Sequence, residues 1–345
     1  MNNLKWVEVD LGAIRSNVRW TMSRLDRGVS LMAVVKADGY GHGAAAVARE
    51  ATREGATSLG VLTVSEAAAL RKAGIKAPIQ LLSPLLPEQA PEAVKLKLIP
   101  TIDGARHIEA LPPGYPVHVD VDFGLGRWGV APKDLPQFLR RARKLRLAGV
   151  STHLDYVPGK NTVEAEEKLR AFGRIAAKLK KDHRGLVAHA ANSSILMDFP
   201  HWQFDMVRAG NLIYGINAAK SKSAPLKMPW RFYCRIIALR RALKGRAIGY
   251  ASEYLAPRTM TVATLPVGYS DGLTMEPAER LIGFGVTGKS YWGKIGEIKA
   301  PFVGRTGIAH TLVDVTDVPD AQVGDPVLLP IRRTACNKNI PRLYV

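Results

Sequence analysis

One short stretch near the N-terminus carries the residue types of catalysis by an amine. An apolar run over residues 31–35 precedes Lys36, and a glycine-rich turn with Tyr40 and His42 follows. A charged lysine beside a buried strand is costly unless it has a use. Lysine also forms Schiff bases when burial or a neighbouring cation lowers its pKa. The alternative is a solvated lysine at a strand end, before a turn through glycine.

Strand-like runs alternate with helical patterns over the first two-thirds of the chain. They cover residues 6–11, 31–35, 58–62, 79–82, 98–102, 116–121, 147–153, 185–190 and 205–215. Repeated strand–helix units of this length predict a parallel sheet, and about eight of them predict a closed (β/α)8 barrel. An open doubly wound sheet is the alternative, although no G-x-G-x-x-G follows the first strand.

The sequence pattern changes after residue 218. Residues 219–231 have no apolar periodicity and are typical of a linker. From residue 232 to residue 345, short β-type runs separated by glycine and proline predict a mainly β domain. These runs cover residues 234–239, 260–265, 281–284, 291–295, 311–315 and 326–329. We therefore expect a barrel over residues 1–218 and a β domain over residues 232–345.

Polar residues follow several of the expected barrel strands. The C-terminal ends of barrel strands meet at one rim, where chemistry is usually built. The polar and glycine residues at these ends are Lys36, Asp120, Asp122, Arg127, His153, His189, Asn192, Ser193, Ser194, Arg208, Gly210 and Asn211. Each alone is more often an ordinary strand-end group than a ligand contact. Their shared rim is what favours a site.

The stretch from Val34 to Gly43 resembles the lysine motif of the alanine racemase family, K-A-[ND]-A-Y-G-H-G, which binds pyridoxal 5′-phosphate (PLP). Further resembling motifs follow in the same order: G-L-G-R-W-G at residues 124–129, V-R-A-G at 207–210 and P-V-G-Y-S-D-G at 266–272. The resemblance implies a fold-type III PLP enzyme with a barrel and a β domain. It also implies interconversion of L- and D-alanine by two-base proton transfer at Cα.

The resemblance assigns roles to individual residues. Lys36 would bind the cofactor covalently and act as one acid–base group, and Tyr250 would act as the other from the partner subunit of a homodimer. Arg208 would face the pyridine nitrogen and keep it unprotonated, because arginine only donates. The other cofactor-binding residues would be Tyr40, His153, Ser193, Gly210, Asn211 and Lys338. The substrate-binding residues would be Arg127, Tyr269 and Ile308.

Three departures from the family's pattern bear on the chemistry. Asp120 stands where the family usually has a lysine, often carbamylated, that orients the substrate-binding arginine. We hypothesise that its carboxylate supplies the same charge to Arg127. The diverged loop over residues 306–310 has Ala309 where the family has an aspartate near the tyrosine base. Near the C-terminus, Lys338 replaces a phosphate-contacting tyrosine, and lysine also binds phosphate.

Composition bounds the class of protein. Hydrophobic residues make up 47% and charged residues 23% of the 345 residues, as in soluble globular proteins. No signal peptide or membrane span is evident, and Cys234 and Cys336 lack metal-ligand spacing, so we expect a cytoplasmic protein with no metal and no membrane partner. The net charge of +19 is spread over both halves. Solvated helix faces explain it better than nucleic acid, which we do not expect as a partner.

Other functions remain open on the sequence. They are a racemase of another amino acid such as serine or a basic one, a decarboxylase of the same fold, and a PLP-binding protein without turnover. Arg208 disfavours the decarboxylase, since many decarboxylases place a carboxylate at the pyridine nitrogen. Ala309 is the reason to consider a PLP-binding protein without turnover. It also leaves the identity of the substrate and the rate of reaction open.

Overall fold

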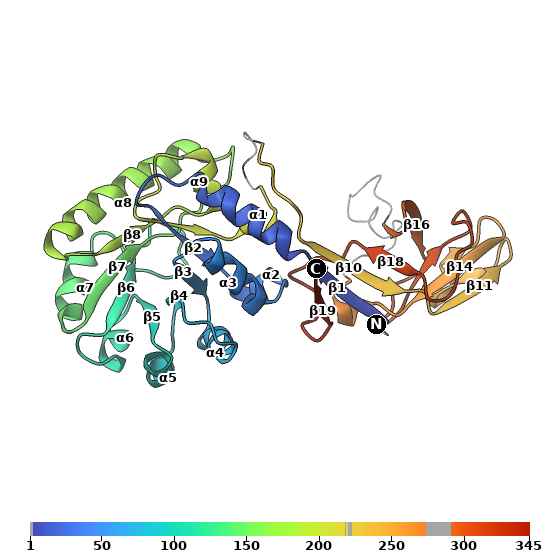
Figure 1. Ribbon diagram of the computed structural model, residues 1–345, viewed down its shortest axis with the longest axis horizontal. Helices are drawn as coiled ribbons and strands as arrows, with labels where there is room; N and C mark the ends of the chain where they lie inside the picture. The colour runs from blue at the N-terminus through green and yellow to red at the C-terminus, as the bar shows by residue number, and fades with distance from the viewer. Residues whose placement is uncertain (1–2, 218, 220–222, 274–290) are drawn as a thin grey trace. The chain divides into compact units, whose positions relative to one another are not determined.

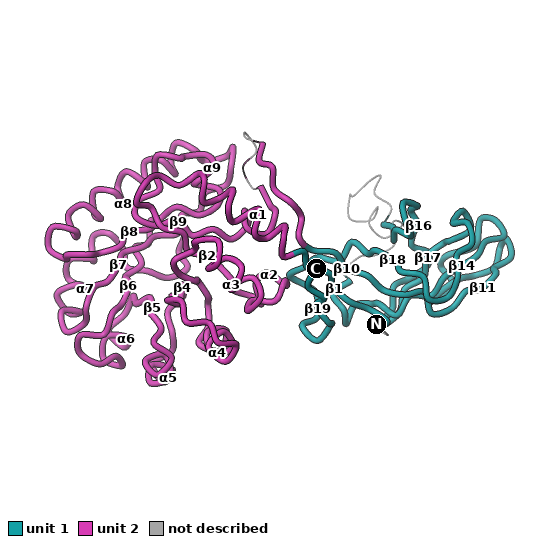
Figure 2. Tube along the Cα trace, viewed as in Figure 1, with its two compact units in different colours: residues 1–10, 230–345 teal, residues 11–229 magenta. Residues whose placement is uncertain are grey.

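The computed structural model describes residues 3–217, 219, 223–273 and 291–345. The chain forms two compact units, shown in two colours in Figure 2. Unit 1 comprises Met1–Asp10 and Trp230–Val345, and unit 2 comprises Leu11–Pro229. The expected linker, residues 219–231, therefore contains the point at which one unit gives way to the other.

Unit 2 contains eight parallel strands in the order β8-β7-β6-β5-β4-β3-β2-β9. They are β2 (Ser30–Val34), β3 (Ser58–Val61), β4 (Ile79–Pro84), β5 (Leu98–Ile102), β6 (Pro116–Asp120), β7 (Arg146–Ser151), β8 (Val187–His189) and β9 (Met206–Ala209). The two end strands approach each other through a bridge between Asn192 and Arg208, and the Arg208 amide donates to the Ala191 carbonyl at 2.9 Å. The predicted barrel is thus confirmed as an eight-stranded near-barrel.

Helices cover the outer side of these strands, as α3 to α8 show in Figure 1. The helices of unit 2 are α1 (Leu11–Met22), α2 (Lys36–Tyr40), α3 (Ala44–Arg53), α4 (Val64–Lys72), α5 (Ala90–Lys95), α6 (Ala105–Ala110), α7 (Leu135–Arg141), α8 (Thr162–Asp182) and α9 (Ser193–Asp198). Helix α4 begins with a capping box in which the Thr63 hydroxyl accepts from the Glu66 amide. Across the described ranges, no helix has the length and apolar character needed to cross a membrane.

Unit 1 is built on a nine-stranded sheet in the order β11-β14-β17-β16-β15-β18-β10-β1-β19. Its strands are β1 (Lys5–Val9), β10 (Trp230–Arg235), β11 (Ala238–Ala242), β14 (Met260–Leu265), β15 (Trp292–Ile295), β16 (Ile298–Val303), β17 (Thr311–Asp314), β18 (Pro326–Leu329) and β19 (Arg342–Tyr344). A separate two-stranded hairpin is formed by β12 (Ala247–Ile248) and β13 (Tyr254–Leu255), which lie between β11 and β14 in the sequence. The prediction of a mainly β region after the barrel is confirmed.

Three expected elements differ from the structure or lie outside it. The run over residues 6–11 forms β1, which pairs with β10 and β19 of unit 1 and does not open the barrel. Its buried Val7 and Val9 indicate a strand with a covered face but do not indicate which sheet covers it. The run over residues 205–215 is a strand only to the end of β9, after which η3 (Asn211–Tyr214) is a 3-10 helix. The run over residues 281–284 lies outside the described residues.

Candidate active site

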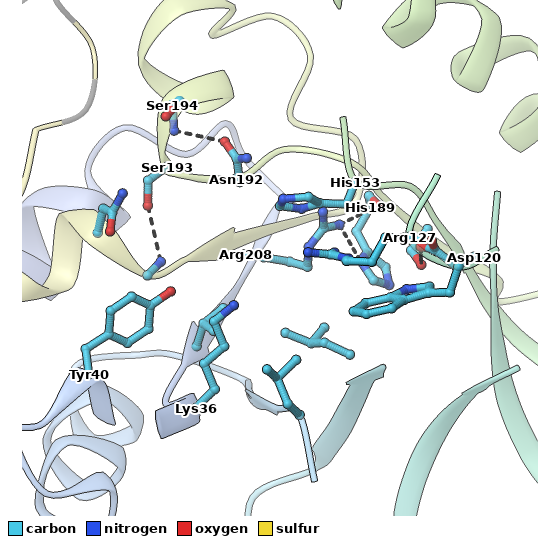
Figure 3. A pocket seen from close by; sticks show the side chains of 17 residues that line it. Lys36, Tyr40, Asp120, Arg127, His153, His189, Asn192, Ser193, Ser194 and Arg208 are labelled. Atoms are coloured by element: carbon cyan, nitrogen blue, oxygen red, sulfur yellow. Dashed lines mark hydrogen bonds between the residues drawn. The ribbon is translucent and has the colours of Figure 1, made fainter. Parts of the chain in front are cut away.

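The carboxyl ends of the barrel strands surround a cavity of about 260 Å³ (Figure 3). Its lining consists of Val34, Lys36, Tyr40, Leu62, Leu82, Asp120, Arg127, Trp128, Ser151, His153, His189, Asn192, Ser193, Ser194, Arg208, Gly210 and Asn211. Apart from Asp122, every candidate that the sequence placed at the rim of the barrel is among them. In Figure 3, Tyr40 and Ser193 lie at one end, Arg127 and Asp120 at the other, and Lys36 and Arg208 between them.

The turn that carries Lys36 has an unusual backbone. Residues 37–40, directly after Lys36, have φ between +52° and +60°. This left-handed conformation costs about 1–2 kcal/mol for each residue that has a Cβ atom, and only Gly39 of the four lacks one. Strain of this kind persists where the surrounding structure holds it, and it is common at functional sites.

Glu66 holds this turn from the start of α4. Its Oε1 accepts from the Ala37 amide at 2.6 Å, and its Oε2 accepts from the Leu62 amide at 2.8 Å. Burial, followed by the charge of Arg127, lowers the pKa of Lys36, while the Glu66 carboxylate raises it. Because the lowering causes prevail, Lys36 has a larger fraction of free amine at neutral pH than a solvated lysine.

Small groups and backbone amides form the end of the cavity near Tyr40. The Gly210 amide donates to Ser193 Oγ at 3.2 Å, and Asn192 fixes the neighbouring turn by accepting from the Ser194 amide at 2.9 Å. A Cβ atom at position 210 would lie 2.6 Å from the Tyr40 hydroxyl, so glycine is needed for the phenol to lie there. Hydroxyl and amide donors with so little bulk suit a phosphate group.

Arg208 is buried in the cavity wall, and its guanidinium is fixed by four acceptors. Nη1 donates to His189 Nδ1 at 2.8 Å and to the His189 carbonyl at 2.6 Å. Nη2 donates to the Thr152 carbonyl at 2.8 Å and to the Ala190 carbonyl at 3.1 Å. Within the described residues no acceptor meets Nε, which leaves that donor for the cavity. Burial lowers the pKa of Arg208 to about 10, so the group stays charged at neutral pH.

Two further cavity residues have pKa values set mainly by burial. Burial, together with the charges of Arg208, Arg127 and Lys36, lowers the pKa of His153 to about 3. Burial raises the pKa of Asp120 to about 6, against the lowering effect of a hydrogen bond from Ser151 Oγ at 2.6 Å. At neutral pH, His153 is therefore neutral and Asp120 is charged.

Arg127 lies on a loop that is held from both sides. Its guanidinium carbon lies 3.9 Å from the centre of the Trp128 ring, which is a cation–π contact. Asp122 accepts from the Gly126 amide at 3.2 Å, and Asp103 accepts from the Gly129 amide at 3.0 Å. Asp120 influences Arg127 through charge, without a direct ion pair between the two described side chains.

The remaining candidates, Tyr250, Tyr269, Ile308 and Lys338, lie in unit 1. The Tyr269 amide donates to the Gly307 carbonyl at 3.1 Å, and a Cβ atom at position 307 would lie 3.3 Å from the Tyr250 ring. Both tyrosines therefore lie against the diverged loop over residues 306–310. Tyr250 is 70% exposed, Tyr269 42% and Ile308 75%. Lys338 is also exposed, on the segment before β19.

The sequence did not indicate the site roles of four residues. Glu66 has the spacing of a helix cap, three residues after Thr63, and His189 is a polar strand end, and neither signal indicates the contacts made in the site. The position of Trp128, directly after Arg127 in the sequence, could have indicated its contact with the guanidinium. His118 had no such signal, because its contact with His189 depends on the three-dimensional register of β6 and β8. In the described part of the chain, no group of three or more histidine, cysteine or acidic residues could hold a metal ion.

Comparison with known proteins agrees with this geometry. Residues 9–218 match the family model of the alanine racemase N-terminal domain, and residues 230–340 match that of the C-terminal domain. The alanine racemase of Halothermothrix orenii is 33% identical over 340 residues, which cover 94% of this chain and 86% of the relative. That of Desulfovibrio desulfuricans is 34% identical, with coverage of 94% and 88%.

Solved structures give the same result. The alanine racemase of E. faecalis has a TM-score of 0.86 and 28% identity, with coverage of 99% of this chain and 98% of that one. The alanine racemase of Bacillus anthracis with bound L-Ala-P has a TM-score of 0.89 and 25% identity, with coverage of 100% and 96%. On this sequence and structural similarity, the chain belongs to the alanine racemase family, the PLP-dependent isomerases that interconvert the two enantiomers of alanine.

Proposed function

We propose that the cavity of unit 2 binds PLP and alanine, and that Lys36 is the residue to which the cofactor is attached. The observation that carries the proposal is the arrangement around Lys36, with hydroxyl and amide donors at one end of the cavity and a fixed arginine in its wall. Bound PLP supplies the electron sink that makes the Cα proton of an amino acid acidic. The residues present fit that group by size, charge and donor type.

The donors near Tyr40 are proposed to bind the phosphate of the cofactor. They are the hydroxyls of Tyr40 and Ser193 and the backbone amides of Gly210 and Asn211. Support comes from their position at one end of the cavity and from the close packing of Tyr40 on Gly210. Lys338, an exposed cation of unit 1, is proposed as a further phosphate partner.

Arg208 is proposed to donate its Nε hydrogen to the pyridine nitrogen. Its four Nη hydrogens already meet protein acceptors, so the guanidinium has one donor left and cannot turn. Because a charged arginine has no acceptor to offer, the ring nitrogen would stay unprotonated. The ring is then a weaker electron sink, which favours return of the Cα proton over side reactions. His153, neutral at physiological pH, would lie beside the ring.

Lys36 and Tyr250 are proposed to move the Cα proton on opposite faces of the substrate. Lys36 is suited to the first role by the burial that lowers its pKa. Tyr250 would act in the site of a second copy of the chain, so that a homodimer holds two shared sites. The exposure of Tyr250, Tyr269 and Ile308 on one part of unit 1 supports this, because exposed apolar groups gathered together are typical of an interface.

Arg127 is proposed to bind the carboxylate of alanine, with Asp120 supplying the negative charge that orients it. Trp128 limits the movement of the guanidinium by stacking against it. In unit 1, the Ile308 amide would also reach the substrate carboxylate, and Tyr269 would line the entrance. We further propose a cytoplasmic location, supported by two buried cysteines that form no disulfide.

Proton exchange in deuterated water tests the proposal. The purified chain is incubated with PLP and L-alanine, and proton NMR and chiral chromatography follow Cα exchange and D-alanine. We expect both to appear, and neither to appear in protein from which PLP has been removed with hydroxylamine before dialysis. Exchange with retained configuration would remove Tyr250 from the proposal. No exchange despite bound PLP would overturn it.

A further inference from the structure

A line of three buried polar side chains runs from the cavity wall into the barrel. Arg208 on β9 contacts His189 at the end of β8, and His189 contacts His118 on β6. The distance from Arg208 Nη1 to His189 Nδ1 is 2.8 Å, and that from His189 Nε2 to His118 Nδ1 is also 2.8 Å. All three side chains are buried. Only Arg208 has a role in the function proposed above.

The guanidinium at one end and the His118 acceptor at the other together set the proton positions along the line. A guanidinium only donates, so His189 Nδ1 must accept and carries no proton. A neutral His189 then carries its proton on Nε2 and donates it to His118 Nδ1. His118 must in turn carry its proton on Nε2. One pair of tautomers, with both rings neutral, satisfies both short contacts.

The electrostatic surroundings agree with two neutral rings. Burial, followed by the charges of Arg208 and Arg146, lowers the pKa of His118 to about 3. Burial and the charge of Arg208 hold the pKa of His189 well below its usual range. A proton added to either ring would bring two donors face to face, besides adding a charge beside Arg208.

The barrel makes room for His118 at one specific position. Gly149 on β7 lies directly opposite His118 in the parallel register. A Cβ atom at position 149 would lie 2.4 Å from Cε1 of the His118 ring. A glycine inside a strand weakens the strand and often marks a close approach of another group. Here the group that approaches is the imidazole of His118.

We propose that His118 is a positioning residue that acts through His189 on Arg208. By accepting from His189 Nε2, it fixes the tautomer that offers Nδ1 to the guanidinium. Arg208 then keeps its Nη atoms on the protein and its Nε hydrogen directed at the cavity. The proposal rests on the function proposed above in one respect, namely that Arg208 faces the cofactor ring.

Nitrogen NMR of the histidine rings tests the proton positions without reference to catalysis. The full chain is labelled with ¹⁵N-histidine and measured with and without PLP from about pH 6 to about pH 8. His118→Asn and His189→Asn assign the two signals, and the exposed ring of His201 serves as the solvated reference. We expect the rings of His118 and His189 to be neutral, each with its proton on Nε2. A charged ring, or a proton on Nδ1 of either ring, would overturn the proposal even if the chain racemises alanine.

Two substitutions at position 118 test the action on Arg208. His118→Asn keeps an acceptor oxygen near the place of Nδ1, whereas His118→Leu removes the acceptor and keeps an apolar volume. With PLP bound, we expect H118L to populate both tautomers of His189 and to lose roughly tenfold to a hundredfold in kcat, as expected for a misplaced catalytic group. H118N should stay within about twofold of wild type.

The pH dependence of the visible absorbance of bound PLP completes the test. It should change in H118L, where the guanidinium is no longer fixed, and stay as in wild type in H118N. Equal absorbance profiles and kcat values in H118L and wild type would contradict the proposal. If H118L does not fold, as judged by circular dichroism, the tautomers of wild type and H118N decide the matter. A chain that binds no PLP would refute the proposed function while leaving the tautomer result valid.

Discussion

Most candidate residues of unit 2 are buried or half-buried, and several are fixed by hydrogen bonds, whereas those of unit 1 are exposed. Arg208 makes four hydrogen bonds through its Nη atoms, and Glu66 holds the strained turn after Lys36. Tyr250 and Ile308, in contrast, have most of their surface in contact with solvent. A site built for chemistry needs its groups positioned before substrate arrives. Unit 2 meets that condition by itself, and in the proposed homodimer the residues of unit 1 would become fixed at the site of a second copy.

The first prediction concerns Lys36, in the cavity of unit 2. Lys36→Ala should abolish racemisation, with a loss of at least about 10⁴-fold, because in the proposed function both attachment of the cofactor and one proton transfer depend on the amine. D-alanine formation by chiral chromatography measures the loss. The thermal unfolding midpoint should change little, since no other described side chain depends on Lys36 for a hydrogen bond. Retained racemisation would place the catalytic amine elsewhere.

The second prediction concerns the exposed hydroxyl of Tyr250, in unit 1. Tyr250→Phe should lower racemisation by about 10²–10⁴-fold, because one proton transfer would lose the acid–base group proposed for it. The variant should still exchange the Cα proton of one enantiomer in deuterated water, through Lys36, while the other enantiomer stays unexchanged. PLP affinity and stability should match wild type, as expected for an exposed hydroxyl. Equal loss of exchange in both enantiomers would show that Tyr250 has a different role.

The third prediction concerns Glu66, which holds the turn after Lys36 and has no proposed contact with substrate. Glu66→Gln replaces one acceptor oxygen by a donor and should lower kcat roughly tenfold by disturbing the turn after Lys36. The pKa of Lys36 in protein free of PLP should fall further, because the Glu66 charge raises it. The rate of amine modification against pH measures that pKa. Glu88→Gln, a change in η1 (Pro87–Gln89), is the matched control and should change neither quantity.

The fourth prediction concerns pH and Asp120. The carboxyl has a pKa of about 6, so it is charged above that pH and neutral below it. The KM for alanine should therefore rise by about tenfold as pH falls through 6, since a tenfold loss needs only about 1.4 kcal/mol of orientation at Arg127. Asp120→Asn should have the higher KM at every pH. A wild-type KM that stays constant across this range would separate Asp120 from substrate binding.

The smallest expected effect is on stability. Because the folded pKa of Asp120 lies above the ordinary value of 3.8, ionisation opposes folding. Its contribution to the free energy of unfolding should therefore fall by about 1–3 kcal/mol between pH 4 and pH 6 and be constant outside that window. The difference between wild type and D120N in urea unfolding isolates this contribution. A difference that rises with pH would contradict the assigned direction.

The sequence predicted the rim of the barrel better than the parts that position it. Lys36 and Arg208 could be placed because the ends of parallel strands meet at one edge. The left-handed turn after Lys36 could not be predicted, since alanine, aspartate and tyrosine all disfavour positive φ. The sequence also could not indicate which sheet β1 joins, because the apolar pattern of a strand with a covered face is the same in either sheet.

The contact between His118 and His189 depends on register between strands that are not neighbours in the sheet, so it has no local signal. Glu66 shows the same limit in milder form. Its spacing from Thr63 is typical of a capping box but gives no sign of the second contact, to the Ala37 amide.

The most direct test of the account combines two inactive subunits. Lys36→Ala and Tyr250→Phe chains with different tags are co-expressed, and the hybrid dimer is purified through both tags. If Tyr250 acts in the site of the partner, the hybrid has one intact site, formed by Lys36 of one chain and Tyr250 of the other. We predict about half the activity of the wild-type dimer, by the symmetry of a two-site assembly. An inactive hybrid, or a chain that stays monomeric while racemising alanine, would contradict the division of the site between two copies.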